Sequence, residues 1–399
     1  MHKSFDKQCI FTIHKLTCVK EPLVQSVAVK PTLLEKFGLY YLNAFNRKDA
    51  THSVFDISDA DLKKKVTRIT NKALFLTCIV SVICVFPTVW VDLYFTQSPM
   101  LIHYGWVAGV TIVSVVVELY LLFLIALKAV HDVSVLINMH ATQKDFLKEG
   151  PFSVLNILSR TALEVPDPEL KILGIDPFKR ISKKNLFILS LLYKAKIFVT
   201  NFILKRVLLY VFGATVLGIP IEYEALIVEC FWNSVVIIRV IHEARLRLFG
   251  FALANQIADN VLNDHLLEQL SDKAKIGAMR AIGNAVVMAQ NYHPNMIILI
   301  LRFQELLHIT KEHRYDDWKL FLETLEEVSE KEKNFLLDLF TVAACFDGRI
   351  SRLEAENLKD AYKEDYELYH PRLLQLAHSL KHGQLHTALD LCKIDFVAG

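Results

Sequence analysis

Two long apolar segments separated by a short loop constrain this chain more than any other feature. The first runs from Ala73 to Val91, and the second runs from Tyr104 to Leu127 with Glu118 as its single charged residue. A helix needs about 20 apolar residues to cross the ~30 Å hydrocarbon core of a bilayer. Both segments reach that length, so the sequence predicts a transmembrane helical hairpin over residues 73–127.

The rest of the chain carries too much charge to consist only of membrane spans. Of the 399 residues, 53% are hydrophobic and 22% are charged. Residues 1–72 hold 13 Lys and Arg against 7 Asp and Glu, whereas residues 310–399 hold 12 against 18. We therefore expect a small membrane portion joined to larger aqueous parts. The fold class is all-α, because no segment of convincing length shows the alternation of a strand.

The charges that flank the hairpin predict its orientation. The loop from Asp92 to His103 contains no Lys or Arg. The positive-inside rule then places both termini in the cytoplasm and this loop outside. Seven cysteines without a CxxC pair favour a reducing compartment. The basic residues on the cytoplasmic side are Lys63, Lys64, Lys65, Arg68, Lys72, Lys128, Lys144 and Lys148.

The chain divides into four parts on this basis. Residues 1–72 form a cytoplasmic N-terminal region ending in a basic approach helix, 73–127 the hairpin, 128–309 a cytoplasmic or membrane-interface helical region, and 310–399 a C-terminal domain. Within the third part, the uncharged run Val207–Ile221 has only 15 residues and is followed by Glu222, Glu224 and Glu229. A short run and nearby carboxylates make a second full crossing costly. We favour a re-entrant hairpin or a buried helical pair at 207–240, with full spanning as the open alternative.

Glu118 is the first candidate functional residue, because it falls near the middle of the second span. In an antiparallel hairpin, Thr77 and Ser81 of the first span lie at about the same depth. A carboxylate inside a membrane suggests proton relay or ion passage. The alternative is structural: a protonated Glu118 hydrogen-bonds Thr77 or Ser81 and fixes the register of the two helices.

No sequence motif indicates an enzyme. The chain lacks HExxH, P-loop and GxGxxG patterns, and no nucleophile–base set or metal-ligand spacing is visible. We therefore predict no catalytic, cofactor-binding or metal-binding residues and no nucleic-acid partner. The carboxylates at 222–229 are interpreted as a polar turn at the membrane surface.

The C-terminal part has the clearest local signals in the chain. Ser329 with Glu332, and Ser351 with Glu354, are capping boxes that open two helices. Asp347-Gly348 forms the turn between these helices, and Gly383 ends a later helix. A calcium loop of the EF-hand type is excluded, because its first two ligand positions fall on Ala343 and Cys345.

The run from Phe335 to Glu356, with Asp347, Gly348 and Glu354 at the turn, resembles the helix–Asp-Gly–helix core of TerB-like domains. These domains occur in tellurite-resistance proteins and in membrane-anchored DnaJ-like co-chaperones. The resemblance covers about 318–392 and implies a small helical bundle that acts in signalling, stress response or metal sensing. We carry over no metal ligand, since Phe346 stands next to the turn.

A fainter likeness at 207–250 is carried by Gly218-Ile219-Pro220, Arg239 and Phe249-Gly250. It resembles an uncharacterised bacterial membrane family that often accompanies GTPases. Together the two resemblances imply a protein of the bacterial inner membrane. We expect a membrane-anchored scaffold or sensor whose TerB-like domain meets a protein partner, in stress response or envelope signalling. The alternative is a small channel or transporter formed by a homo-oligomer around Glu118.

Overall fold

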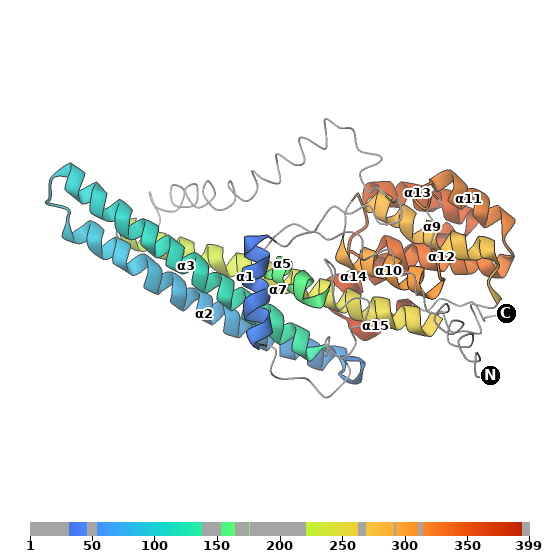
Figure 1. Cartoon of the computed structure of the whole chain (residues 1–399), viewed down its shortest axis with the longest axis horizontal. Helices are drawn as coiled ribbons and strands as arrows, with labels where there is room; N and C mark the ends of the chain where they lie inside the picture. The colour runs from blue at the N-terminus through green and yellow to red at the C-terminus, as the bar shows by residue number, and fades with distance from the viewer. Residues whose placement is uncertain are drawn as a thin grey trace, which may run out of the picture.

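The protein is helical throughout the part described by this computed structural model, which covers residues 32–45, 54–137, 153–163, 175, 221–261, 269–290, 293–309 and 314–392. These residues contain no strand, so the predicted all-α class is confirmed. Figure 1 shows a long helical arm at one end and a compact bundle at the other, with one helix running from the arm into the bundle. The helices are α1 (Leu33–Phe45), η2 (Val54–Asp56), α2 (Asp59–Tyr94), α3 (Met100–Leu136), α5 (Val154–Ala162), α7 (Ile221–Val261), α9 (Asp272–Ala289), α10 (Pro294–Leu306), α11 (Trp318–Glu327), α12 (Glu330–Ala344), α13 (Arg352–Tyr362), η4 (Lys363–Asp365), α14 (Tyr366–His382) and α15 (Leu385–Leu391).

The arm consists of α2 and α3, which form the predicted hairpin. Both helices extend beyond the apolar segments at 73–91 and 104–127. The basic approach segment at 61–72 belongs to α2. This helix begins after Ser58, and the Ser58 hydroxyl caps it by accepting a hydrogen bond from the Asp61 amide. At the tip, the rings of Phe95 and Trp106 stack 5.8 Å apart and tie the two helices together. Asp92 and His103 also meet there, at 3.1 Å.

The surface of this hairpin is apolar and exposed. In the most apolar stretch of α2 only 22% of the residues are buried, and in that of α3 only 17%. A core helix of a water-soluble protein would bury most of such a surface, because soluble proteins rarely expose apolar patches of this size. Both helices are long and apolar enough to cross a membrane.

A third helix, α7, packs along the hairpin and then continues into the bundle (Figure 1). Its first half contacts α2 and α3, and its second half contacts α10, α14 and α15. Residues 221–240 form one uninterrupted helix without a turn. Residues 207–220 lie outside the described residues, so a re-entrant hairpin at 207–240 stays a prediction. The linker at 164–168 and most of 1–72 also lie outside them.

Two short helices cross the arm where it meets the bundle. α1 lies against α3 and α5. Glu35 of α1 pairs with Arg160 of α5 at 2.6 Å, and both side chains are buried. Gly38 permits this close approach, because an added Cβ would lie 2.0 Å from the Ser159 hydroxyl oxygen. The burial of Glu35 opposes its ionisation, but hydrogen bonds from Arg160 and Thr32 outweigh it and lower its pKa.

The bundle combines the C-terminal helices with two helices from the region before them. α9 packs against α10, α11, α12 and α13. Gly277 of α9 faces Leu336 of α12 so closely that a Cβ would come within 2.8 Å of that side chain. The backbone amide of Ser271, which caps α9, donates to Glu332 at 2.8 Å. Helices from before and after residue 310 therefore pack together in one bundle.

The local signals in this part predict its backbone well. Both capping boxes are present, and Gly348 and Gly383 have φ values of 72° and 74°. A residue with a Cβ rarely adopts these left-handed conformations, which explains the two glycines. Pro371 lies inside α14 rather than at the start of a helix, since α14 already begins at Tyr366.

We predict that residues 269–399 form a stable unit and that residues 310–399 do not, because the shorter fragment lacks the helix that fills the centre of the bundle. Circular dichroism with thermal melting of both fragments is the measurement. The longer fragment should show a cooperative melt, and the shorter one a broad and weaker transition. Equal melting temperatures would show that α9 and α10 are dispensable for the bundle.

Candidate functional site: a polar cluster in the arm and a clasp at its base

The first candidate site is a buried polar cluster between the three helices of the arm. Asn233 of α7 donates its side-chain amide to the Ser81 hydroxyl at 2.9 Å and to Glu118 Oε1 at 2.6 Å. Glu229, one turn earlier on α7, lies 3.4 Å from the same amide nitrogen. Ser81 is fully buried, and Asn233 and Glu118 are almost fully buried.

Two of the predicted residues of the arm, Glu118 and Ser81, are thus joined, but by Asn233, which is not among the residues predicted from the sequence. Glu118 and Ser81 share the amide of Asn233. Thr77 lies one turn from Ser81 and is also fully buried, and its hydroxyl has no hydrogen-bond partner among the described residues. The signal for Asn233 is an isolated amide in the apolar run from Cys230 to Ile238. Such residues act as hydrogen-bonding contacts between membrane helices.

Neighbouring contacts hold α7 in the same register on α2. The Cys230 thiol lies 3.7 Å from the Cys78 carbonyl oxygen, and the Cys78 sulfur lies 3.6 Å from the Ser234 hydroxyl. Small polar side chains allow close helix packing in lipid, where their hydrogen bonds replace the hydrophobic driving force available in water. The cluster is therefore suited to fastening α7 to the hairpin.

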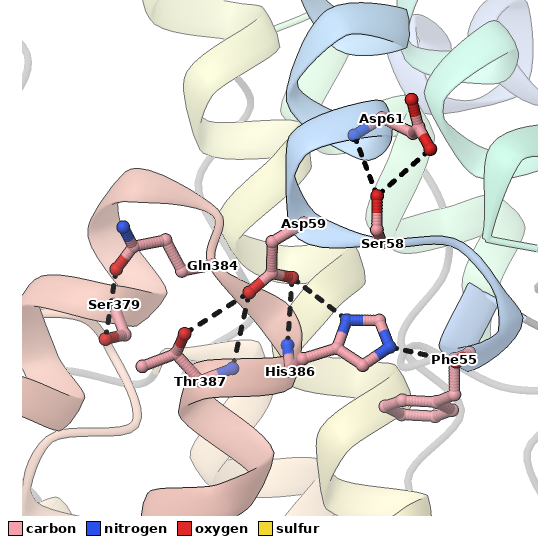
Figure 2. A network of polar contacts seen from close by, with 8 residues as sticks. All are labelled: Phe55, Ser58, Asp59, Asp61, Ser379, Gln384, His386 and Thr387. Atoms are coloured by element: carbon pink, nitrogen blue, oxygen red, sulfur yellow. Dashed lines mark hydrogen bonds and ion pairs between the residues drawn. The ribbon is translucent and has the colours of Figure 1, made fainter.

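The second candidate site joins the start of the hairpin to the last helix of the bundle, and Figure 2 shows it. Asp59, in the first turn of α2, accepts hydrogen bonds from the backbone amides of His386 and Thr387 at 3.0 and 3.3 Å. These are orphan donors at the start of α15, whose own N-cap residue, Gln384, makes no side-chain cap. Asp59 therefore caps α15 from another part of the chain.

The side chain of His386 completes this contact, which we call the clasp. Its Nδ1 lies 3.0 Å from Asp59 Oδ1, and its Nε2 lies 2.9 Å from the Phe55 carbonyl oxygen. A carboxylate and a carbonyl only accept hydrogen bonds, so both ring nitrogens must donate and the imidazole is doubly protonated in this geometry.

The surroundings of the clasp favour both charges. The hydrogen bond to Phe55, followed by the contacts with Asp59 and the field of Asp390, raises the pKa of His386 against the effect of burial. Burial opposes the ionisation of Asp59, but the hydrogen bonds from His386 and Thr387 outweigh it and lower its pKa. The clasp thus contains an ion pair between the arm and the bundle.

The predicted turn residues of the C-terminal part serve a different contact. Asp347 Oδ1 accepts from the Arg349 amide at 2.9 Å, and Gly348 packs on Leu246 of α7. The buried Asn295 side chain donates to the carbonyls of Leu246 and Phe346 at 3.1 and 3.0 Å. The turn is therefore docked on the second half of α7.

Glu354 is enclosed in this part of the bundle. It caps α13 by accepting from the Ser351 amide at 2.6 Å, and the Ser351 hydroxyl donates to the Met288 carbonyl of α9. Burial raises the pKa of Glu354 to about 8 and also raises the pKa of Asp347. Within the described residues, no group of three or more His, Cys, Asp or Glu side chains is arranged to hold a metal ion.

Comparison with protein-family models, with curated proteins and with solved structures finds no match for this chain. The resemblance of 318–392 to TerB-like domains therefore stays a prediction from its residues.

We predict that Asn233→Leu destabilises the arm by roughly 0.6–2 kcal/mol, the range of hydrogen bonds between membrane helices. The change leaves Glu118 and Ser81 without the amide that joins them. Thermal unfolding in detergent, followed by circular dichroism, measures the loss. Asn43→Leu, at an exposed position of α1, is the matched control. Equal loss in both variants would refute a fastening role for Asn233.

We predict that the clasp weakens as the pH rises. The folded-state pKa of His386 is raised above its ordinary 6.5, so its contribution is complete below pH 6.5 and is lost as the pH rises through the folded value. Asp59 has a lowered pKa, so its contribution is lost only as the pH falls below about 3.8. The clasp is therefore strongest between these two values.

Hydrogen exchange at the amides of α15 in the intact protein measures the clasp. Protection in the wild type should fall as the pH rises above 6.5, after correction for intrinsic exchange. His386→Gln should remove this pH dependence, and Asp59→Asn should lower protection at every pH. The clasp mechanism is wrong if the wild type and His386→Gln give parallel curves.

Proposed function

We propose that the chain is a membrane-anchored scaffold or sensor of the bacterial inner membrane, which holds a helical bundle at the cytoplasmic surface for a protein partner. One observation carries this proposal: the exposed apolar arm and the bundle are joined twice, by the continuous helix α7 and by the clasp between Asp59 and His386. Two attachments fix the bundle relative to the bilayer, as presentation to a partner requires.

The charges support the same orientation for the arm and the bundle. The basic residues 63–65 lie within the first two turns of α2, close in sequence to Asp59, which contacts α15. The bundle is therefore at the basic end of the hairpin. By the positive-inside rule this end is cytoplasmic, and so are both termini. The excess of six acidic residues in 310–399 keeps that part away from anionic lipid and available to a protein partner.

The second candidate function is a small oligomeric channel or transporter around Glu118. Its support is the presence of two carboxyl groups, of Glu118 and Glu229, next to one amide inside the arm. The geometry favours the scaffold, because Asn233 donates its shortest hydrogen bond to the Glu118 carboxyl group and so occupies it. A passing ion would have to displace that amide.

We predict that a cysteine at residue 98, in the hairpin tip, reacts with an impermeant maleimide added to intact cells. A cysteine at residue 368, which is exposed on α14, should react only after the membrane is opened. Both variants are made in a background without the native cysteines. Labelling of residue 98 only after lysis, or of residue 368 in intact cells, would overturn the orientation and the proposed cytoplasmic bundle.

We predict that Glu118→Gln preserves folding and partner binding, because a glutamine oxygen still accepts from the Asn233 amide. Flux of protons or cations through purified protein in liposomes is the discriminating measurement. The scaffold predicts no flux in either form. Flux in the wild type that disappears in Glu118→Gln, with unchanged protein level, would establish the channel instead.

A further inference from the structure

The outward side of α7 in the arm is apolar. Among the side chains that the structure describes between residues 227 and 238, the exposed ones are Ile227, Phe231, Val235 and Ile238. Their spacing of four, four and three residues places them on one stripe of the helix. The opposite side of α7 packs on α2 and α3 and carries Asn233. A contiguous exposed apolar stripe of this kind marks a surface that lipid or another protein covers.

The stripe is continuous with the apolar surface of the hairpin. The neighbouring helices expose Phe75, Ile79 and Ile83 on α2 and Val113, Val116 and Val117 on α3. α7 packs against both helices, so its exposed stripe belongs to the same three-helix arm as these side chains. Whatever covers the hairpin must therefore also meet α7.

The polar cluster sets the depth of α7. Asn233 contacts Glu118, near the middle of the second apolar segment, and Ser81 of the first. If the hairpin spans the bilayer, Asn233 lies near its midplane. Glu224 then stands about 14 Å and Arg239 about 9 Å along the helix from that plane, at 1.5 Å per residue. The half-thickness of the hydrocarbon is about 15 Å, so the first turn of α7 reaches the outer boundary.

This placement removes the objection that the carboxylates raise against a membrane position. The backbone of residues 222 and 224 belongs to the first turn of α7, near the edge of the hydrocarbon rather than at its centre. Glu229 lies deeper but faces the amide of Asn233 instead of lipid. Arg239 is exposed on the cytoplasmic side, where a long cationic side chain reaches the headgroups.

We propose that the first half of α7 is a third membrane-embedded helix, whose stripe Ile227, Phe231, Val235 and Ile238 contacts the acyl chains of the bilayer. The partner of this surface is lipid. The inference rests on the proposed membrane anchor and adds to it that a single helix runs from the outer half of the bilayer to the docking contacts of the bundle.

Spin labels on single cysteines of the full-length protein in liposomes test this proposal. The labelled positions are 231 on the stripe, 117 on α3 next to Glu118, and 368 on the bundle, all exposed side chains. Oxygen concentrates in the hydrocarbon and a nickel chelate stays in water, so the ratio of their collision rates reports depth. Circular dichroism confirms that each labelled protein is folded.

The label at 231 should give a ratio that favours oxygen and matches that at 117, with the reverse at 368. Lipid exposure at 117 with water exposure at 231 would overturn the placement of α7 and leave the hairpin anchor intact. Water exposure at both positions would overturn the anchor as well. A label at 238 should report a shallower depth than at 231, and equal depths would contradict a helix that crosses the leaflet.

Discussion

The hydrogen bonds from the Asn233 amide to Glu118 and Ser81 determine how the rest of the molecule is arranged. Apolar side chains do not drive helices together in lipid, because the lipid tails are equally apolar. In the proposed membrane setting, the hairpin and α7 therefore need specific contacts to hold one register. Asn233 provides such contacts near the middle of the two apolar segments. An unpaired Glu118 carboxyl group would be most costly to bury at that depth. This contact, with those of Cys78 to Cys230 and Ser234, fixes the position of α7 on the hairpin.

Because α7 is one continuous helix, its position on the hairpin also sets the position of the bundle. The same helix that meets Glu118 in the arm packs on α10 and α14 at its other end. There the carboxylate of Glu243 pairs with Arg247 at 2.8 Å, and His293 lies close to it. Burial raises the pKa of Glu243, but hydrogen bonds and charges from His293 and Arg247 outweigh it and hold the pKa well below its usual range. The charged second half of α7 is thus compensated inside the protein.

Local signals in the sequence predict the local features of this structure. The apolar runs predict the hairpin, Ser329 and Ser351 predict the starts of α12 and α13, and Gly348 and Gly383 predict two left-handed turns. Each of these features depends on residues within one continuous run or one turn of the sequence. The Glu243–Arg247 pair, one helical turn apart, is of the same kind.

The contacts that the sequence does not reveal join residues far apart in the chain. Asn233 is 115 positions from Glu118, and His386 is 327 positions from Asp59. Nothing near Asp59 distinguishes it from an ordinary acidic residue in the first turn of a helix. Its second role arises because Ser58 already caps α2, which leaves the Asp59 carboxylate for the amides of α15.

The Asn233 contact and the clasp also differ in how they respond to pH. This difference helps to distinguish a scaffold from a sensor. The Asn233 contact lies inside the arm, away from water, and is fastened by an amide that does not titrate. The clasp is partly exposed and depends on a doubly protonated imidazole. A rise in pH through the folded-state pKa of His386 therefore loosens the bundle from the base of the hairpin while α7 stays attached to its middle. The bundle then has one fixed attachment and one that responds to pH, as the sensor form of the proposed function would use.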